Sequence, residues 1–445
     1  MKSRRLANIS HVWLLVPWLG IVLAARRPIR DNSFLWHIQA GHLQQSSGQV
    51  LVTDPFSLAF YGEPWRTQSW LLELIYARLG DGLGWVGSFV GIMAGLTLLA
   101  AGVAVYQSTR SVRLTGGLLI WLELLALPYF APRPVIVSFV FLSLLLVVLR
   151  SRRLRWAIPV LLWVWASMHG SFVLGIGLVV LDGLARRDRR RVTDVIAGTV
   201  AVSITAHGWH VWEILLTFLG SSDGLGYLTE WAAPDVLSPQ VLPFTALVVA
   251  MYVVATRGGL RTRILWVVAP FVVFGLSTSR AIMPAGLVLM VYLAAAVGRV
   301  EPRNDQPSAV ATVLVVVLAV VPLTLSFAHS SQLDPVRFPV ALAASLEDLP
   351  TFHDDVVGGY LIFRGEAPSR VLFDDRADLY PADFLGSLVR VRSGTPLWQP
   401  FFQKYEIDQV LIRHSDGLGQ ALEESGEWVE VASDDEFTIW RRRSA

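Results

Sequence analysis

The sequence predicts a mainly α-helical membrane protein, a polytopic transmembrane bundle of about eleven spans with a C-terminal extracytoplasmic α/β domain. Three observations lead to this fold class. Hydrophobic residues make up 53% of the 445 residues and charged residues only 16%, whereas soluble domains carry nearer a quarter charged residues. Apolar runs close to bilayer length recur between polar loops, and the arginines between them gather in alternate loops.

The apolar runs give the predicted spans, because a helix needs about twenty apolar residues to cross the bilayer core. The runs lie at 8–25, 84–106, 114–130, 134–149, 156–168, 171–185, 193–207, 240–256, 264–278, 281–298 and 308–327. Several are short, so the pairs 156–168 with 171–185 and 264–278 with 281–298 are open to a second interpretation. Each pair could be one kinked helix.

The distribution of basic residues predicts the orientation. With the N-terminus inside, nineteen Lys and Arg residues fall in cytoplasmic segments and seven in outer loops. Since Lys and Arg accumulate on the cytoplasmic side, this bias predicts an inner-membrane protein with the C-terminal domain outside.

Two polar regions interrupt the pattern, an outer loop at 26–83 and a tail at 328–445. We assign the loop to a transmembrane domain spanning 1–327 and the tail to a separate domain. The loop predicts a helix capped within Asp31–Ser33, reaching about Gln45 and ending near Gly48. Its apolar residues Phe34, Leu35, Ile38 and Leu43 favour the membrane interface. Asp54 and Pro55 are suited to begin another helix, and 65–79 forms a second amphipathic stretch.

The tail predicts a compact α/β domain. β-prone runs lie at 356–363, 370–374, 409–413, 428–433 and 437–442, and helical patterns lie at 339–348, 381–390 and 416–425. At about 115 residues the tail is large enough for a core of its own.

The composition also excludes several kinds of site. The chain has no cysteine, so it can form no disulfide, thiolate nucleophile or zinc–cysteine centre. Its formal net charge of +2 gives no indication of a nucleic-acid partner.

Short motifs recur along the chain. Those in the loop are Asp31, Trp36-His37, Gly41, Thr53-Asp54-Pro55-Phe56-Ser57, Trp65 and Trp70-Leu71-Leu72-Glu73. Further motifs are Trp165 to Ser171, Glu230-Trp231, Arg280, Gly358-Gly359-Tyr360 and Asp374-Asp375-Arg376-Ala377-Asp378-Leu379-Tyr380. Together they resemble a bacterial family of polytopic membrane proteins that is itself similar to the GT-C glycosyltransferases. Ser167 stands where the family usually has Asn, which weakens any role assigned there.

The resemblance implies an enzyme that moves a sugar from a polyprenyl-phosphate carrier to an envelope acceptor on the outer face. It implies an essential aspartate in the first outer loop, at Asp31, which would act as the base or as a metal ligand. A divalent metal such as Mg or Mn is left open as a cofactor. Membrane lipids and the lipid-linked donor are the expected partners.

The residue types give further candidates and plainer alternatives for each. Asp54 is the second candidate for the base, and helix capping is the alternative for both aspartates. His37 and Glu73 are charged or polar groups in an apolar stretch and could extend the substrate site, with a snorkelling side chain as the alternative. Trp36 and Trp70 could stack on a sugar, although interfacial tryptophans are common.

Three further candidates lie outside the loop. His169 interrupts a Trp-rich helical segment, so it lies either in a site or at a turn. Arg280 lies on the face where arginine is rare, and it could hold the phosphate of the donor or anchor to lipid headgroups. The charged turn from Asp374 to Asp378 could bind an acceptor or pair with an outer loop, but ion pairing within the tail is favoured.

Two other functional classes fit the same features. A non-catalytic scaffold for envelope assembly and a transporter of lipid-linked sugars would both be polytopic. The sequence does not identify the sugar, the acceptor or the oligomeric state.

Overall fold

The computed structural model describes residues 21–22, 24–220, 232–300, 331–376 and 378–443. It is mainly helical with a small C-terminal sheet, and the chain divides into two compact units. The first unit comprises residues 1–27, 83–211 and 230–331, and the second comprises 28–82, 212–229 and 332–445.

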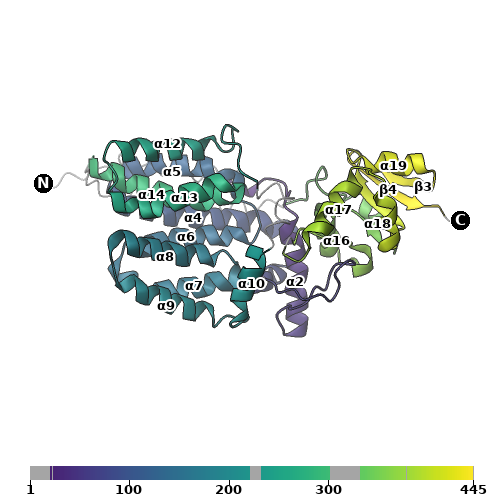
Figure 1. Cartoon of the computed structure of the whole chain (residues 1–445), viewed down its shortest axis with the longest axis horizontal. Helices are drawn as coiled ribbons and strands as arrows, with labels where there is room; N and C mark the ends of the chain where they lie inside the picture. The colour runs from purple at the N-terminus through teal and green to yellow at the C-terminus, as the bar shows by residue number, and fades with distance from the viewer. Residues whose placement is uncertain (1–20, 23, 221–231, 301–330, 377, 444–445) are drawn as a thin grey trace. The chain divides into compact units, whose positions relative to one another are not determined.

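The first unit is a bundle of helices that run side by side (Figure 1). Its described helices are α4 (Val86–Thr109), α5 (Val112–Ala126), α6 (Val135–Val148), α7 (Ala157–Met168), α8 (Phe172–Arg186), α9 (Arg190–Val202), α12 (Leu242–Thr256), α13 (Leu265–Ser277) and α14 (Ile282–Val300). The helix α10 (His210–Gly220) follows at the boundary between the units. Each predicted span from 84 to 298 therefore contains a helix.

Among the described residues, three helical segments are long and apolar enough to cross a membrane. They are Leu83–Thr109, Val112–Tyr129 and Ser279–Gly298. Four shorter apolar helices accompany them. The predicted number of about eleven spans is therefore not confirmed. Most of 8–25 and all of 308–327 lie outside the described residues.

The long helices α4, α5 and α14 pack against one another through small residues. A Cβ added at Gly298 would lie 2.7 Å from the Ser108 carbonyl oxygen, and one at Gly286 would lie 2.8 Å from the side chain of Leu125. Such close approach at glycine is typical of helices packed within a membrane, where dispersion replaces the hydrophobic effect between helices.

The two doubtful pairs of spans are separate helices. His169 between α7 and α8 has φ −165° and ψ 141°, and Thr278 before α14 has φ −152° and ψ 141°. This extended backbone ends the preceding helix in both cases. The interpretation of each pair as one kinked helix is therefore wrong.

The second unit combines the predicted outer loop with the tail. The loop contributes α2 (Ser33–Ser47) and α3 (Trp70–Leu79). The tail contributes β1 (Thr351–Phe352), α16 (Asp355–Phe363), α17 (Ala382–Arg392), α18 (Trp398–Lys404), β2 (Gln409–Arg413), α19 (Leu418–Ser425), β3 (Trp428–Ser433) and β4 (Phe437–Arg442). The strand order is β1-β2-β4-β3, with β1 parallel to β2 and the other pairs antiparallel.

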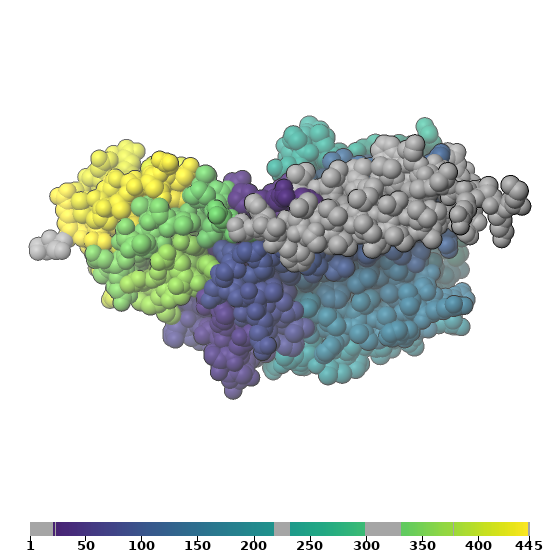
Figure 2. All heavy atoms as spheres, turned by 180° about the vertical axis from the view of Figure 1, so that it is seen from behind, coloured from purple at the N-terminus to yellow at the C-terminus, as the bar shows by residue number. Residues whose placement is uncertain are grey.

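The core of this unit is built jointly by both segments. The loop residues Trp36, Phe56 and Trp65 lie in one apolar cluster with tail residues such as Val357 and Phe437. The backbone N–H groups of the loop residues 58 and 59 donate to the carbonyls of 371 and 372 in the tail, at 2.6 and 3.3 Å. In the space-filling view, purple loop atoms lie directly against green tail atoms (Figure 2). The loop was assigned to the transmembrane domain, whereas the structure places 28–82 in the unit of the tail.

The loop helices differ in part from expectation. α2 ends at Ser47, close to the predicted end near Gly48. Gly48 caps the helix with φ 66°. Phe34, Leu35 and Ile38 are fully buried in the protein, and α2 packs on α3 and α16. These three residues therefore serve protein packing, whereas Leu43 is exposed, and the predicted position of the helix in the membrane interface stays a prediction.

Several tail elements are also corrected. Residues 356–363 form α16 instead of a strand, since the Asp354 side chain caps the helix by accepting from Val357 N–H. Residues 371–374 belong to no strand, and the carbonyls of Val371 and Leu372 accept from the backbone of the loop. Of 339–348, only the short 3₁₀ turn Leu342–Ser345 is helical. The strands at 409–413, 428–433 and 437–442 and the helices near 381–390 and 416–425 are confirmed.

Candidate functional site

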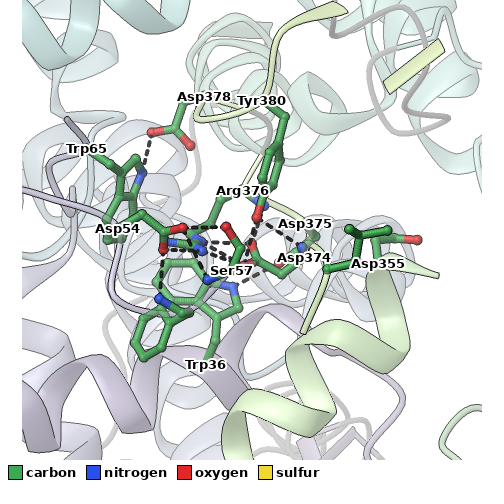
Figure 3. A network of polar contacts seen from close by, with 12 residues as sticks. Trp36, Asp54, Ser57, Trp65, Asp355, Asp374, Asp375, Arg376, Asp378 and Tyr380 are labelled. Carbon is green, nitrogen blue, oxygen red and sulfur yellow. Dashed lines mark hydrogen bonds and ion pairs between the residues drawn. The ribbon is translucent and has the colours of Figure 1, made fainter. Parts of the chain in front are cut away.

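A buried arginine, Arg376, lies at the centre of a polar network in the second unit (Figure 3). Its Nε lies 2.8 and 3.0 Å from the two carboxylate oxygens of Asp374, and its Nη2 donates to Asp374 Oδ2 at 2.6 Å. The same Nη2 lies 2.8 Å from Asp54 Oδ1. Arg376 and both aspartates have almost no solvent exposure, so this is a fully buried ion triad that joins loop and tail.

Three aromatic rings enclose the guanidinium group. Its carbon lies 4.6 Å from the ring centre of Trp65, 5.2 Å from Phe56 and 5.6 Å from Trp36. All three rings come from the loop, and the charge attracts the negative faces of their π-systems. The two tryptophan N–H groups in turn donate to tail carboxylates, Trp36 to Asp375 at 2.8 Å and Trp65 to Asp378 at 3.2 Å.

The surroundings keep the triad charged. Burial alone would lower the pKa of Arg376, but Asp374, Tyr380 and Asp54 raise it well above its usual value. The pKa of Tyr380 is also raised, by burial and by Asp374, so its hydroxyl stays protonated and donates to Asp374 Oδ2 at 3.1 Å. The network is thus held together by charge-assisted hydrogen bonds.

Asp54 has little capacity left for a substrate. Its oxygens accept from the backbone N–H groups of Phe56 and Ser57 at 3.0 and 3.2 Å, from the Ser57 hydroxyl and from Arg376. The segment is a turn without a helix, so the predicted helix start at Pro55 is wrong. This saturation favours a structural role for Asp54 over that of a base.

A second group of carboxylates is more accessible and surrounds the start of α2. Ser33 N–H donates to Asp31 Oδ1 at 3.0 Å, and the Ser33 hydroxyl donates to Asp375. Asn32 Nδ2 donates to the Asp355 carbonyl at 3.5 Å, which brings the start of α16 to the same place. Asp31, Asp355 and Asp375 are each half-buried.

The pKa of Asp355 is raised to about 7 by burial and by the neighbouring Asp354 and Asp375. A carboxyl group with that pKa can exchange a proton near neutrality, as a general acid or base must. Sequence reasoning missed Asp355. Its position beside the Gly358-Gly359-Tyr360 motif was the available signal.

His37 and Glu73 form a buried pair between α2 and α3. His37 Nδ1 lies 2.7 Å from Glu73 Oε1, and Glu73 also accepts from Gln44 at 2.5 Å and from the Thr67 hydroxyl. The His37 ring stacks on Trp36 with 3.5 Å between ring centres. Trp36 therefore contacts both groups, Asp375 through its hydrogen bond and the His37–Glu73 pair through ring stacking.

The remaining candidates divide between the units. Trp70 begins α3, and its indole Nε1 is buried with no hydrogen-bond partner in the part of the chain that the structure describes. His169 and Arg280 belong to the helical unit. His169 caps α7, and its Nδ1 lies 2.9 Å from the Ser171 hydroxyl. Arg280 lies in the 3₁₀ turn before α14. Trp231 and Glu230 lie outside the described residues.

The carboxylates do not form a metal site. Within the described residues, no group of three or more His, Asp or Glu side chains is placed to hold a metal ion. Asp31 therefore has no ligand set around it, and we derive no step through a metal.

A buried histidine holds the segment that leads to Asp374. His353 Nδ1 donates to the Asp354 carbonyl at 2.8 Å, and its Nε2 accepts from Leu372 N–H at 2.9 Å. Burial lowers the pKa of His353. The neutral ring uses both of its nitrogens in these two hydrogen bonds.

We expect His353 to make a contribution to the stability of the second unit that is lost in mild acid. Since the folded-state pKa of His353 lies below the unfolded value of about 6.5, its contribution is complete above that pH and is lost as the pH falls. The slope should be at most about 1.4 kcal/mol per pH unit for one proton. Hydrogen exchange of peptides from 351–376 in the full chain measures it. His353→Gln should flatten this part of the pH dependence and the exposed His414→Gln should not, whereas equal slopes for parent and His353→Gln would contradict the assignment.

Comparison with protein-family models and with curated proteins gives no match to this chain.

Proposed function

We propose that this protein is a membrane glycosyltransferase that moves a sugar from a polyprenyl-phosphate carrier to an acceptor on the outer face of the membrane. The observation that carries the proposal is the pair of half-buried carboxylates Asp31 and Asp375, which both accept from Ser33 at the start of α2. The three helices of membrane-spanning length in the same chain support a lipid-borne substrate. The convergence of the loop and tail motifs on the Arg376 network supports a site to which both segments contribute.

The chemistry asks for a proton acceptor and for compensation of a developing phosphate charge. An acceptor hydroxyl is ionised far above neutral pH, so a carboxylate must take its proton as it attacks the anomeric carbon. Asp31 is our candidate for that base, and Asp355 at the start of α16 is a second carboxyl group of the unit, with a pKa raised to about 7. The departing lipid phosphate also needs a cation, because an arginine stabilises its charge through paired hydrogen bonds.

The network around Arg376 holds these carboxylates in place. Asp375 accepts from Trp36 and Ser33 of α2, while its neighbours Asp374 and Arg376 anchor the tail to Asp54. Substrate-positioning groups of an enzyme need such rigid support, since small displacements cost large factors in rate.

We expect Asp31→Asn to reduce sugar transfer by about 10²- to 10⁴-fold, the usual contribution of a general base. The assay uses the full chain in membranes with a panel of synthetic polyprenyl-phosphate sugars. The matched control is Asp348→Asn, because Asp348 is an exposed carboxylate paired with Arg370 at 2.9 Å and should leave transfer unchanged. Equal transfer by the Asp31 variant and the parent would remove Asp31 from the mechanism.

The alternative is a non-catalytic scaffold, and one observation favours it. Asp54, Trp36 and Trp65 of the motif set are occupied by partners within the protein, as expected if the motifs specify assembly of the unit. Under this alternative the parent transfers none of the panel sugars, and Asp31→Asn still supports envelope assembly.

A further inference from the structure

Two connections at one end of the helical unit are locked together by buried charges. Arg191, at the start of α9, lies 3.2 Å from Asp182 of α8 and 3.1 Å from Asp194, and it donates to the Leu149 carbonyl at 3.0 Å. Arg155, before α7, lies 2.5 Å from Asp194. The connection between α6 and α7 is therefore fixed against the connection between α8 and α9.

This end carries a large excess of positive charge. Nine arginines and three aspartates lie within 150–155 and 182–194. Asp182 and Asp194 are buried and occupied by Arg155, Arg186 and Arg191. The exposed arginines that have no ion-pair partner within the described residues are Arg152, Arg153, Arg187, Arg189 and Arg190. The locked connections thus present an array of five free guanidinium groups.

Exposed apolar side chains lie within a turn of these arginines. Trp156 is 70% exposed, Leu184 57% and Val192 60%. They stand next to the arginines on α7, α8 and α9, and the exposed apolar residues Val160 and Ile196 continue along the same helices. Tryptophan beside arginine at the end of an apolar helix surface is typical of the headgroup level of a membrane.

We propose that these two connections form a binding surface for the phosphate headgroups of anionic membrane lipids, with the apolar residues beside the arginines contacting the acyl chains. Guanidinium groups bind phosphate oxygens through paired hydrogen bonds, and clusters of basic residues beside membrane helices attract anionic lipids. A nucleic acid or an acidic soluble protein would match the charge alone, whereas a lipid also covers Trp156, Leu184 and Val192. The inference is independent of the sugar-transfer proposal.

The test uses the full chain purified in a neutral detergent. We expect phosphatidylglycerol, but not phosphatidylcholine, to remain bound in native mass spectrometry and to raise the melting temperature. Replacing Arg152, Arg153, Arg187 and Arg189 together with Gln should weaken phosphatidylglycerol binding by about tenfold or more, and raising the salt concentration should weaken binding to the parent.

The matched control removes four exposed or half-exposed arginines elsewhere. Gln at Arg26, Arg66, Arg390 and Arg443 changes the net charge by the same amount and should leave lipid binding unchanged. Three results would overturn the proposal. They are equal retention of phosphatidylcholine, an equal melting-temperature rise with inorganic phosphate, and equal loss of binding in the two quadruple variants.

Discussion

Arg376→Met is expected to destabilise the second unit by about 3–5 kcal/mol, the cost of removing one partner from a buried ion pair. The change leaves Asp54 and Asp374 buried without the cation that lies 2.8 and 2.6 Å from them. It also removes the charge enclosed by Trp36, Phe56 and Trp65. Native free energies of unfolding are about 5–15 kcal/mol, so the change should remove a large share of the stability of the unit and make it open more often. Limited proteolysis and hydrogen exchange of 28–82 and 332–443 in the full chain measure the effect.

Arg370→Met is the matched control in the same part of the tail. Arg370 pairs with Asp348 and Glu366 at the surface, where such pairs contribute about 0–1 kcal/mol. Arg376→Lys keeps the charge but loses the paired geometry, so it should fall between the two. If Arg376→Met resists protease as well as Arg370→Met does, the buried triad does not hold the unit together.

The helical unit was largely predictable because hydrophobic runs report burial in membrane or protein directly. Every described run from 84 to 298 contains a helix. The number of crossings could not be predicted in the same way. Runs such as 134–149 and 156–168 give helices Val135–Val148 and Ala157–Met168, which are shorter than a bilayer requires on its own.

The joint folding of loop and tail could not be predicted from local patterns. The contacts of Asp54 with Arg376 and of Trp36 with Asp375 join residues more than 300 positions apart, and no periodicity records such pairing. The same contacts explain an error within the tail. Residues 370–374 have strand composition, but the carbonyls of Val371 and Leu372 accept hydrogen bonds from Leu58 and Ala59 of the loop.

The misassigned helix α16 has a different cause. Its residues Val356–Phe363 are apolar on all sides, and a short apolar run fits a buried strand as well as a buried helix. The deciding features are the Asp354 cap and Gly358, where an added Cβ would lie 1.9 Å from the Phe373 carbonyl oxygen. The apolar run alone predicted a strand, because the helix cap at Asp354 was not taken into account.

The candidate site was predictable only in its loop half. Asp31 was selected, and its capping hydrogen bond to Ser33 was the stated alternative. Asp374 to Asp378 were noted as a charged turn with internal ion pairing, which the contact of Arg376 with Asp374 confirms. Asp355 was missed although it lies beside the Gly358-Gly359-Tyr360 motif, and the approach of Asp375 to α2 depends on the fold of the whole unit.

The joint folding of loop and tail restricts how the chain can cross the membrane. Residues 28–82 and 332–445 fold together, so they must lie on the same side, and the chain between them must cross an even number of times. If the three long apolar helices in that interval each cross the membrane, they give an odd number of crossings. The proposed topology then needs at least one further crossing, by one of the four shorter apolar helices or by the predicted span at 308–327 outside the described residues.

A disulfide between Asn32→Cys and Gly359→Cys should form in most chains. A Cβ at Gly359 would lie 3.4 Å from the Asn32 Cβ, close to the 3.5–4.5 Å typical of disulfides, and the natural chain has no competing cysteine. After cleavage at a protease site inserted at Gly258–Gly259, the two fragments should stay joined until reductant is added. The control pair Asn32→Cys and Ser387→Cys should separate. Formation in growing cells without added oxidant would support an extracytoplasmic site, because cytosolic thiols stay reduced. If the purified protein does not cross-link even with a copper oxidant and its two fragments also separate under native conditions, the contact between Asn32 and Gly359, and with it the site proposed at Asp31 and Asp375, is contradicted.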